Sequence, residues 1–348
     1  MTILIQILGI AVGFGFLIFI HELGHFLVAK ICKVKILTFA FGFGPDIIKH
    51  TYKGTKYCIK AIPFGGFVSM AGDDPDKATG ADGEYLSLKW YKKAWIALAG
   101  PLSNYILAAF ILAFVFNIWG SIRSSSVGSV VENSPAKQAG IMPGDKIKSI
   151  DGIEIDTWDE LTSNLKDKTG KQTVLVVERG THSFDLNMTV TKNPVTNFSV
   201  IGIEPSTVKV KLGFVKSILR GVKYPIRMTV ENVEHLANVI VSFKKPAISG
   251  PIGIMRAMAD ATKTGMYNYL SLLAFISVAL GLFNLLPIPM VDGGMIVLFF
   301  IEGIIRKRIS AKVVQVYNTI GLVFIGGIFI FATYSDLLHL GIGKLFGK

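Results

Sequence analysis

Near the start of the chain, two histidines and a glutamate stand at a spacing suited to metal chemistry. In the stretch HELGH, His21 and His25 are four residues apart, so on a helix both imidazoles share one face and can bind one zinc ion. Glu22, beside them, can then act as a base toward a water molecule at that ion. In a soluble protein a pattern this short would be weak, because paired helical histidines are often merely packed or exposed.

The sequence around HELGH is that of a membrane protein. Of the 348 residues, 51% are hydrophobic and only 17% are charged. Four runs, 2–20, 94–122, 266–291 and 313–335, lack charged side chains, and each reaches the roughly 20 residues that cross hydrocarbon. We therefore predict four transmembrane helices. We expect the first to be retained, since it lacks the basic start and cleavage site of a secretory signal.

Ionisable residues in such a helix require an explanation. Each costs about 2.5 to 3.5 kcal/mol at the bilayer centre on insertion scales, so an uncompensated cluster is unfavourable. This cost favours a functional metal site over simple packing of His21, Glu22 and His25.

A third ligand is expected from the third apolar run. Two histidines leave zinc short of protein ligands, and a carboxylate is a suitable addition. In NLLPIPMVDGG, residues 284–294, Pro287 and Pro289 interrupt the helix, and Asp292 is the first acid after a long uncharged stretch. Irregular backbone at membrane depth normally lines a protein or water-filled cavity. We predict that Asp292 ligates the metal; its alternative role is that of a helix N-cap.

The distribution of positive charge predicts the orientation. Much of the excess behind the net charge of +12 flanks the connections between the first two and the last two apolar runs, which should be cytosolic. The N-terminus, the central polar segment and the C-terminus are then outside, and the metal site lies in the cytosolic half of the bilayer. Membrane orientation explains the charge better than nucleic-acid binding does. Cys32 and Cys58 are expected to be free thiols.

A soluble α+β domain is predicted at 124–211, where short β-type runs replace the long apolar ones. The expected order is β, α, β, β, α, β, β, with Ser134-Pro135 opening the first helix and Gly140 ending it. The stretch SPAKQAGIMPGDKIKSIDGIEI resembles a PDZ domain of the bacterial protease type. Such domains bind peptides by strand addition, so a peptide ligand is one expectation and a β-rich spacer is the other.

The segment 212–265 links this domain to the third apolar run. Phe214, Val215, Ile218 and Leu219 line one face of a predicted helix, as in helices that lie in a membrane interface. A helix packed on the soluble domain is the alternative.

HELGH and NLLPIPMVDGG, with a PDZ-like insert between them, resemble the site-2 protease family of intramembrane zinc metalloproteases, and the RseP-type bacterial branch most of all. Further matching stretches are FGFGP at 41–45, IPFGGFVSMAG at 62–72, AGPLSN at 99–104 and SGPIGI at 249–254. The resemblance implies zinc ligands His21, His25 and Asp292, and a catalytic base, Glu22.

The resemblance also implies substrate-binding residues. It assigns substrate contact to Asn284 and the segment of Pro287 and Pro289, and pairing of an unwound substrate with a membrane-associated β-hairpin that holds Gly65 and Gly66. Each has a plainer reading: Asn284 can bridge carbonyls freed by Pro287, and glycines suit any hairpin. A secondary candidate, Asn104, can place an amide near the site, although ordinary helix packing explains its neighbours Gly100 and Pro101.

The predicted fold class is a polytopic α-helical membrane protein with four transmembrane helices, a membrane-associated β-hairpin and an inserted PDZ-like domain. Its parts are 1–123 with HELGH, 124–211, 212–265, and 266–348 with NLLPIPMVDGG. The family resemblance implies a protease of the bacterial cytoplasmic membrane that cuts single-span proteins, such as anti-sigma factors or remnant signal peptides. Some relatives carry two PDZ modules, whereas this chain has room for one. A metal transporter and a non-catalytic scaffold are the alternatives.

Overall fold

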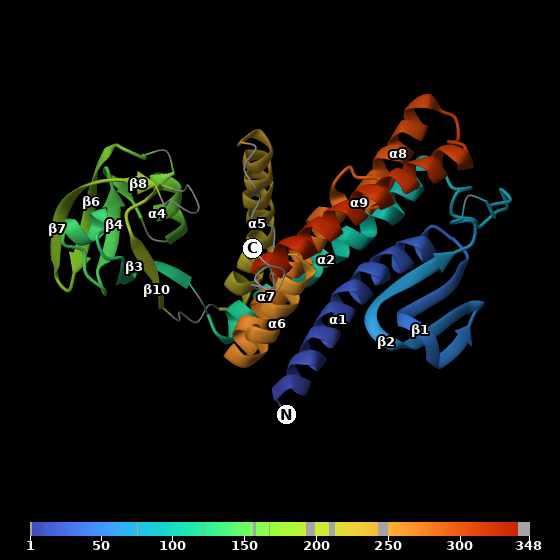
Figure 1. The fold of residues 1–348 in the computed structure, drawn as a ribbon, viewed down its shortest axis with the longest axis horizontal. Coiled ribbons are helices and arrows are strands. Elements are labelled where there is room, and N and C mark those ends of the chain that lie inside the picture. The colour runs from blue at the N-terminus through green and yellow to red at the C-terminus, as the bar shows by residue number, and fades with distance from the viewer. Residues whose placement is uncertain are drawn as a thin grey trace, which may run out of the picture. The chain divides into compact units, whose positions relative to one another are not determined.

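The structure, a computed structural model, describes residues 2–74, 76–120, 122–155, 158–166, 168–192, 199–208, 213–242 and 250–339. The chain forms two compact units (Figure 1). One, which we call the inserted domain, is Phe116–Gly213. The other, the membrane core, consists of the residues up to Val115 and those from Phe214 onward.

Among the described residues of the membrane core, four helices are long and apolar enough to cross a bilayer. They are α1 (Thr2–Ile31), α2 (Trp90–Ile118), α7 (Met266–Leu285) and α9 (Ala311–His339). This confirms the predicted polytopic helical fold. The predicted interruption of the third apolar run at Pro287 and Pro289 is present, because α7 stops at Leu285, just before the two prolines. A separate helix, α8 (Asp292–Ile305), follows the break.

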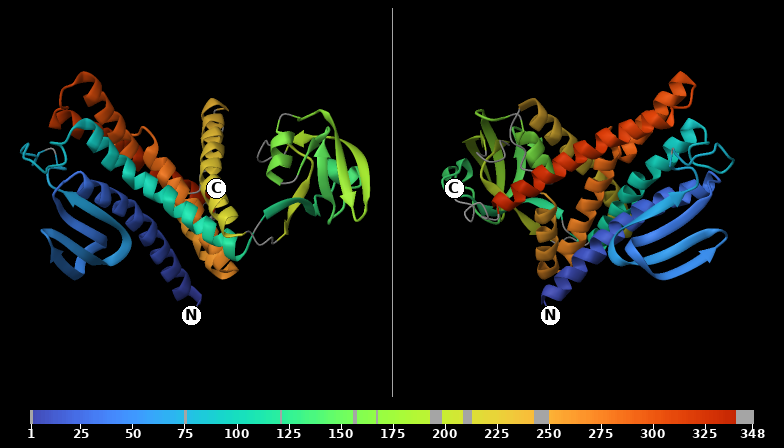
Figure 2. Two further views of the ribbon diagram at one scale, coloured as in Figure 1. Left: turned by 180° about the vertical axis from the view of Figure 1, so that it is seen from behind. Right: turned by 45° about the vertical axis from the view of Figure 1, so that its right-hand side comes forward.

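A two-stranded antiparallel hairpin, β1 (Ile36–Tyr52) and β2 (Thr55–Met70), lies along α1 (Figures 1 and 2). Its strands are long and bent, and Phe39 of β1 pairs with both Tyr57 and Val68 of β2. The bend in β2 requires Gly65, which has φ +96°, where a Cβ would collide with the Phe43 ring. The hairpin therefore folds back on itself and brings the end of β2 against α1.

Two helices precede α7. The amphipathic α5 (Phe214–Ser242) packs against α7 and exposes much of its apolar face, including Phe214, Val215 and Leu219. The other helix, α6 (Pro251–Thr264), is not predicted from its sequence and contacts α1, α7 and α9. It begins at the SGPIGI motif, where the Asp336 carboxylate of α9 accepts hydrogen bonds from the N–H groups of Gly250 and Gly253, both at 2.9 Å.

The inserted domain has an α+β fold. Its antiparallel sheet has the order β10-β3-β4-β6-β7, with β5 paired to β4. Side chains from this sheet and from α4 form one apolar core, which includes Ile147, Leu161 and Leu175. The strands and helices are β3 (Ile122–Val130), α3 (Pro135–Gln138), β4 (Lys146–Ile150), β5 (Ile153–Glu154), α4 (Trp158–Leu165), β6 (Gln172–Arg179), β7 (His182–Thr189), β8 (Thr191–Lys192), β9 (Ser199–Val200) and β10 (Ile203–Val208).

The first seven of these elements follow the predicted order. Ser134 caps α3 by accepting a hydrogen bond from the N–H of Lys137, with Pro135 at the first helical position, as its sequence indicates. The strands β8, β9 and β10 are not predicted. Of these, β10 completes the main sheet by pairing with β3.

Candidate metal centre

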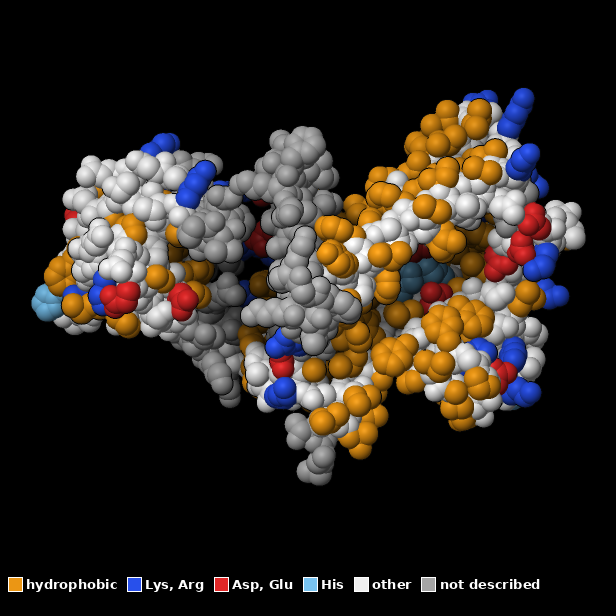
Figure 3. All heavy atoms as spheres, in the orientation of Figure 1, with side chains coloured by type: hydrophobic (Ala, Val, Ile, Leu, Met, Phe, Trp, Pro, Cys, Tyr) orange, Lys and Arg blue, Asp and Glu red, His pale blue; other side chains and the backbone are white. Residues whose placement is uncertain are grey.

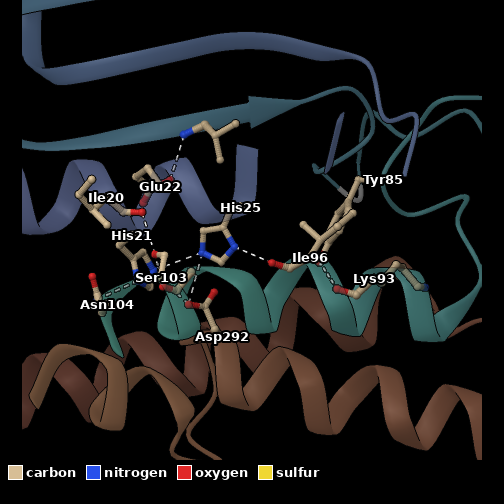
Figure 4. A network of polar contacts seen from close by, with 12 residues as sticks. Ile20, His21, Glu22, His25, Tyr85, Lys93, Ile96, Ser103, Asn104 and Asp292 are labelled. Atoms are coloured by element: carbon tan, nitrogen blue, oxygen red, sulfur yellow. Dashed lines mark hydrogen bonds and ion pairs between the residues drawn. The ribbon is translucent and has the colours of Figure 1, made fainter. Parts of the chain in front are cut away.

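Three potential metal ligands converge from two helices. His21 and His25 project from α1, and Asp292 is the first residue of α8 (Figure 4). The Oδ2 atom of Asp292 lies 3.1 Å from Nε2 of His21 and 3.4 Å from Nε2 of His25. The two Nε2 atoms are 3.2 Å apart. The structure thus brings together three side chains that are separated by up to 271 positions in sequence.

This arrangement fits a zinc ion. Tetrahedral ligands about 2.0 to 2.1 Å from zinc are roughly 3.3 Å from one another, close to all three observed separations. The Oδ2 atom of Asp292 is buried and accepts no hydrogen bond from any described residue. Nitrogen and carboxylate oxygen atoms are also the donors that catalytic zinc sites use. Asp292 does not cap α8, because the N-cap residue is Val291 and no side chain makes a capping hydrogen bond there.

Two glycines let α1 and α2 approach closely enough to form the site. A Cβ on Gly24 would collide with the backbone of Ala99. One on Gly100 would collide with the imidazole of His25 and lie 2.8 Å from Cε1 of His21. Ser103 joins the two helices by donating to the carbonyl of Ile20 over 2.7 Å. The AGPLSN stretch therefore provides the space in which the imidazoles lie.

The α2 helix also contacts the far nitrogen of each histidine. Nδ1 of His25 lies 2.7 Å from the carbonyl oxygen of Ile96, so it carries a proton and leaves the Nε2 lone pair for a metal. The amide nitrogen of Asn104 lies 3.2 Å from Nδ1 of His21 (Figure 4). Turning the Asn104 amide by 180° would place its oxygen at this position, where it accepts from Nδ1 and gives His21 the same tautomer as His25. Asn104 is fully buried.

The segment with the two prolines shapes the start of α8. Gly293 and Gly294 allow the start of α8 to pack on the backbone that precedes it. A Cβ on Gly293 would collide with the backbone of Leu285, and a Cβ on Gly294 would lie 3.0 Å from Cα of Pro289. Tyr317 of α9 donates to the carbonyl of Gly294 over 3.0 Å. These contacts hold Asp292 toward α1.

Glu22 is held from the other side by the hairpin. The backbone N–H of Val68 in β2 donates to Oε2 of Glu22 over 3.1 Å. A Cβ on Gly66 would lie 2.7 Å from the carbonyl oxygen of Ala40 and 3.8 Å from Cγ of Glu22. Because the Val68 N–H bonds to a side chain of α1, this edge of β2 faces the site.

A cavity of about 360 Å³ opens at these residues. Figure 3 shows histidine side chains recessed beside acidic ones, between surfaces rich in apolar side chains. Residues beyond the predicted ligands also line the cavity: Val68, Met70, Tyr85, Ile96, Ala97, Asn284, Met290, Val291 and Met295.

The predicted substrate residues occupy different positions around this cavity. Asn284 lines it, whereas the neighbouring Pro287 and Pro289 do not; they form the non-helical turn that brings Met290 and Val291 to its wall. Gly65 and Gly66 are buried in the bend of β2. Asn104 is not among the lining residues, and its buried amide contacts His21 instead.

Sequence reasoning missed several contributors. The Ile96 carbonyl and the Val68 N–H act through backbone atoms, which leave no signal in residue type. Tyr85 is buried in the cavity wall, and this burial raises the pKa of its phenol. A buried ion pair between Lys93 of α2 and Glu302 of α8, at 2.6 Å, links two helices that serve the site.

Comparison with known proteins agrees with this chemistry. Residues 9–328 match the model of peptidase family M50. A "Putative zinc metalloprotease" of Agrobacterium fabrum is 32% identical over 352 residues, covering 93% of both chains. Another so named, of Clostridium perfringens, is 33% identical over 333 residues, covering 94% of this chain and 96% of its own.

A Bacillus subtilis relative named "Regulator of sigma-W protease RasP" is 28% identical over 408 residues, covering 94% of this chain and 97% of its own. Among solved structures, the PDZ domain of an SdrC-like protein of Listeria innocua is 26% identical with a TM-score of 0.22, covering 24% of this chain and 92% of that one. The family match spans both the HELGH helix and the Asp292 segment. The chain therefore belongs to peptidase family M50, the site-2 protease family of zinc metalloproteases.

Proposed function

We propose that this protein is an intramembrane endopeptidase that hydrolyses peptide bonds in or near the transmembrane segment of single-span membrane proteins. The observation that carries the proposal is the meeting of His21 and His25 of α1 with Asp292 of α8, at 3.1 and 3.4 Å, inside a helical membrane core. A transport site would leave Glu22, beside these ligands, without a role. A non-catalytic scaffold would have no need of the assembled ligand set.

His21, His25 and Asp292 are the proposed zinc ligands, for the reasons of distance and donor type given above. Zinc, when bound, supplies a Lewis acid that polarises the scissile carbonyl and makes a neighbouring water more acidic. Ile96 holds the His25 ring through Nδ1. We assign Asn104 the same positioning role toward His21, in place of the substrate contact expected from sequence.

Glu22 is the proposed general base. It follows His21 on α1, and its carboxylate lines the same cavity as the ligands. The Val68 N–H holds one carboxylate oxygen. Glu22 takes a proton from water and passes it to the amine of the leaving peptide.

The substrate must be unwound before it can be cut. A transmembrane helix satisfies its amides internally, so exposing one requires replacement hydrogen bonds inside the protein. The edge of β2 near Gly66 and Val68 faces the site and can pair with an extended strand, as in peptide recognition by strand addition. Asn284 offers a donor and an acceptor to the same backbone from the opposite wall.

We place the site in the cytosolic half of the bacterial inner membrane, with the N-terminus and the inserted domain outside. The positive flanks of the spans support this orientation. The inserted domain is proposed to bind a peptide of the substrate or of another protein, and the exposed apolar face of α5 to lie in the interface. The name of the Bacillus relative favours a regulatory substrate, such as a membrane-bound anti-sigma factor.

The test compares purified wild type with Glu22→Gln, using a tagged single-span substrate in detergent. Loss of the base is expected to lower cleavage by about 100- to 10,000-fold, while zinc content stays at about one ion per chain if the ligand set is correct. Glu154→Gln, an exposed change in the inserted domain, is the matched control and should cleave normally. Equal cleavage by Glu22→Gln and wild type would refute the assignment of the base.

The ligand set is tested separately by metal analysis. Asp292→Ala should lose zinc on dialysis under conditions in which wild type and Glu22→Gln retain it. Full zinc occupancy in Asp292→Ala would show that α8 does not supply a ligand. Zinc-dependent flux into liposomes by a protein that cuts none of a panel of model substrates would favour a transporter.

A further inference from the structure

A second cavity, of about 670 Å³, lies away from the metal centre, where the start of α2 meets the end of α8. We call it the basic pocket and define it by the lining residues Lys89, Trp90, Arg306, Lys307 and Arg308. Figure 3 shows Lys and Arg side chains gathered at this end of the membrane core.

The positive charge of the basic pocket exceeds the negative charge that the described residues place beside it. Glu302 also lines it, but both of its oxygens face Nζ of the buried Lys93, at 2.6 and 2.8 Å. Within the described parts of the chain, no carboxylate pairs with Lys89, Arg306 or Lys307. Four cationic side chains therefore surround one cavity, and the single acid on its wall is already neutralised.

The wall of the pocket is built by close packing. A Cβ on Gly303 would lie 2.6 Å from the Trp90 indole, so this glycine lets α8 pack directly on the ring. Trp90 also meets Phe300 edge to face, with centroids 5.6 Å apart. Arg306 ends α8 in the left-handed conformation, with φ 53°, and the guanidinium of Arg308 donates to the carbonyl of Ser87 over 3.1 Å.

Exposed apolar side chains continue from the pocket along both helices. Tyr91 and Trp95 of α2 are 41% and 57% exposed, and Phe300 and Ile304 of α8 are 55% and 71% exposed. A cationic cavity above an apolar wall matches an amphiphile that has an anionic head and hydrocarbon chains. Tryptophan and tyrosine at this level are typical of the bilayer interface.

We propose that the basic pocket binds the phosphate headgroup of an anionic phospholipid, whose acyl chains lie along the exposed faces of α2 and α8. Basic pockets between transmembrane helices bind such headgroups. A bound lipid would bridge two helices that serve the metal centre, since α2 holds His25 through Ile96 and α8 begins with Asp292. The bilayer would thereby stabilise the site from outside it.

The test measures binding of brominated phosphatidylglycerol to the purified full-length protein in detergent, by tryptophan quenching. Arg306→Gln/Lys307→Gln should weaken binding by about 30-fold, since each basic residue near an anionic surface contributes roughly a factor of five. Arg306→Lys/Lys307→Arg keeps the charge and should bind normally.

The matched control is Lys33→Gln/Lys35→Gln, which removes two exposed charges outside the pocket. Lys33 has a positive φ, as Arg306 does, so the control also matches the backbone conformation of one substituted residue. It should bind within about twofold of wild type, because its charges lie outside the proposed site. Equal weakening by the control and the pocket variant would mean general surface attraction and would overturn the proposal, as would no weakening by either.

Two further ligands distinguish the source of the phosphate. Brominated phosphatidylcholine, which carries a phosphate but no net charge, should bind at least tenfold more weakly than phosphatidylglycerol. Inorganic phosphate should not displace the anionic lipid at matched ionic strength. Displacement at similar concentrations would assign the pocket to a soluble phosphate and overturn the lipid proposal.

Discussion

The membrane core and the inserted domain use buried polar side chains in opposite ways. In the inserted domain the interior is a continuous apolar cluster, and the buried Asp145 ties strands together through Arg179. In the membrane core many large apolar side chains are exposed, while Asn104, Lys93 and Asp336 are buried. Water drives apolar side chains inward in one unit, whereas in lipid the polar contacts decide which helices meet.

The same difference between the two units predicts where substitutions will affect function and where they will affect stability. Each buried polar group of the membrane core named above joins elements distant in sequence, and Asn104 does so at the candidate metal centre. In the inserted domain they stabilise the sheet. Substitutions in the two units should therefore have separable effects. Those in the membrane core should change metal binding and cleavage, and those in the inserted domain should first change the local stability of that domain.

The largest effect is expected from Gly100→Ala. The added Cβ collides with the His25 imidazole and crowds His21, so the ligands are displaced. Because a misplacement of about 1 Å can cost 100-fold in rate, cleavage should fall at least that much, and zinc content should fall with it. Gly326→Ala, also in a membrane helix but with no atom within 4 Å of the new Cβ, should behave as wild type. Normal zinc binding by Gly100→Ala would show that the imidazoles lie elsewhere.

Asn104→Ala should have the next largest effect among the membrane-core variants, a loss of zinc affinity. Removing a partner of a ligating histidine typically costs 10- to 100-fold in metal affinity, and competition with a zinc chelator measures this loss. Ser277→Ala is the control, since Ser277 donates to the carbonyl of Asn104 over 2.8 Å but does not touch the imidazole. If both variants lose affinity equally, Asn104 acts through helix packing rather than through His21.

Leu175→Ala tests the inserted domain. Leu175 is fully buried in the apolar core, so its truncation should destabilise the domain by about 2 to 5 kcal/mol. Hydrogen exchange of the β4 and β6 amides in the intact protein should accelerate by more than about 30-fold, with zinc content unchanged. Val174→Ala, at a neighbouring exposed position, should change little. Loss of zinc on Leu175→Ala would break the separation of the two units.

The smallest effect is a pH dependence from Asp145. Burial alone would raise the pKa of this carboxyl, but the Arg179 guanidinium and the Met142 N–H outweigh it and hold the pKa below its usual range. The stabilisation that the ionised Asp145 carboxylate gives the folded domain is therefore present above its unfolded-state pKa of about 3.9. It is lost as the pH falls through the lower folded-state pKa. At pH 7 the β4 and β6 amides of Asp145→Asn should exchange hydrogen faster than those of wild type, after correction for intrinsic exchange rates. This difference in exchange rate should shrink as the pH falls toward 3. A difference independent of pH would contradict this origin.

Local patterns predicted much of this protein because they depend on neighbouring residues. The helical spacing of His21 and His25, the four apolar runs and the Ser134-Pro135 helix start are each read within a few turns of chain. The break at Pro287 and Pro289 is also local, since proline lacks the N–H that a helix requires. What followed it, a separate helix beginning at Asp292, depended on packing that the pattern does not contain.

Residue types and local periodicity were enough to predict the candidate metal ligands, the four spans and an inserted α+β domain. The three-dimensional fold was needed to show that Asp292 lies 3.1 Å from His21, that Asn104 faces an imidazole rather than the cavity, and that the Val68 N–H donates to Glu22. The physical reason is that these contacts join distant segments, and several use backbone carbonyl or N–H groups, which nearly every residue carries. Glycines such as Gly100 take on meaning only once the facing atoms are known.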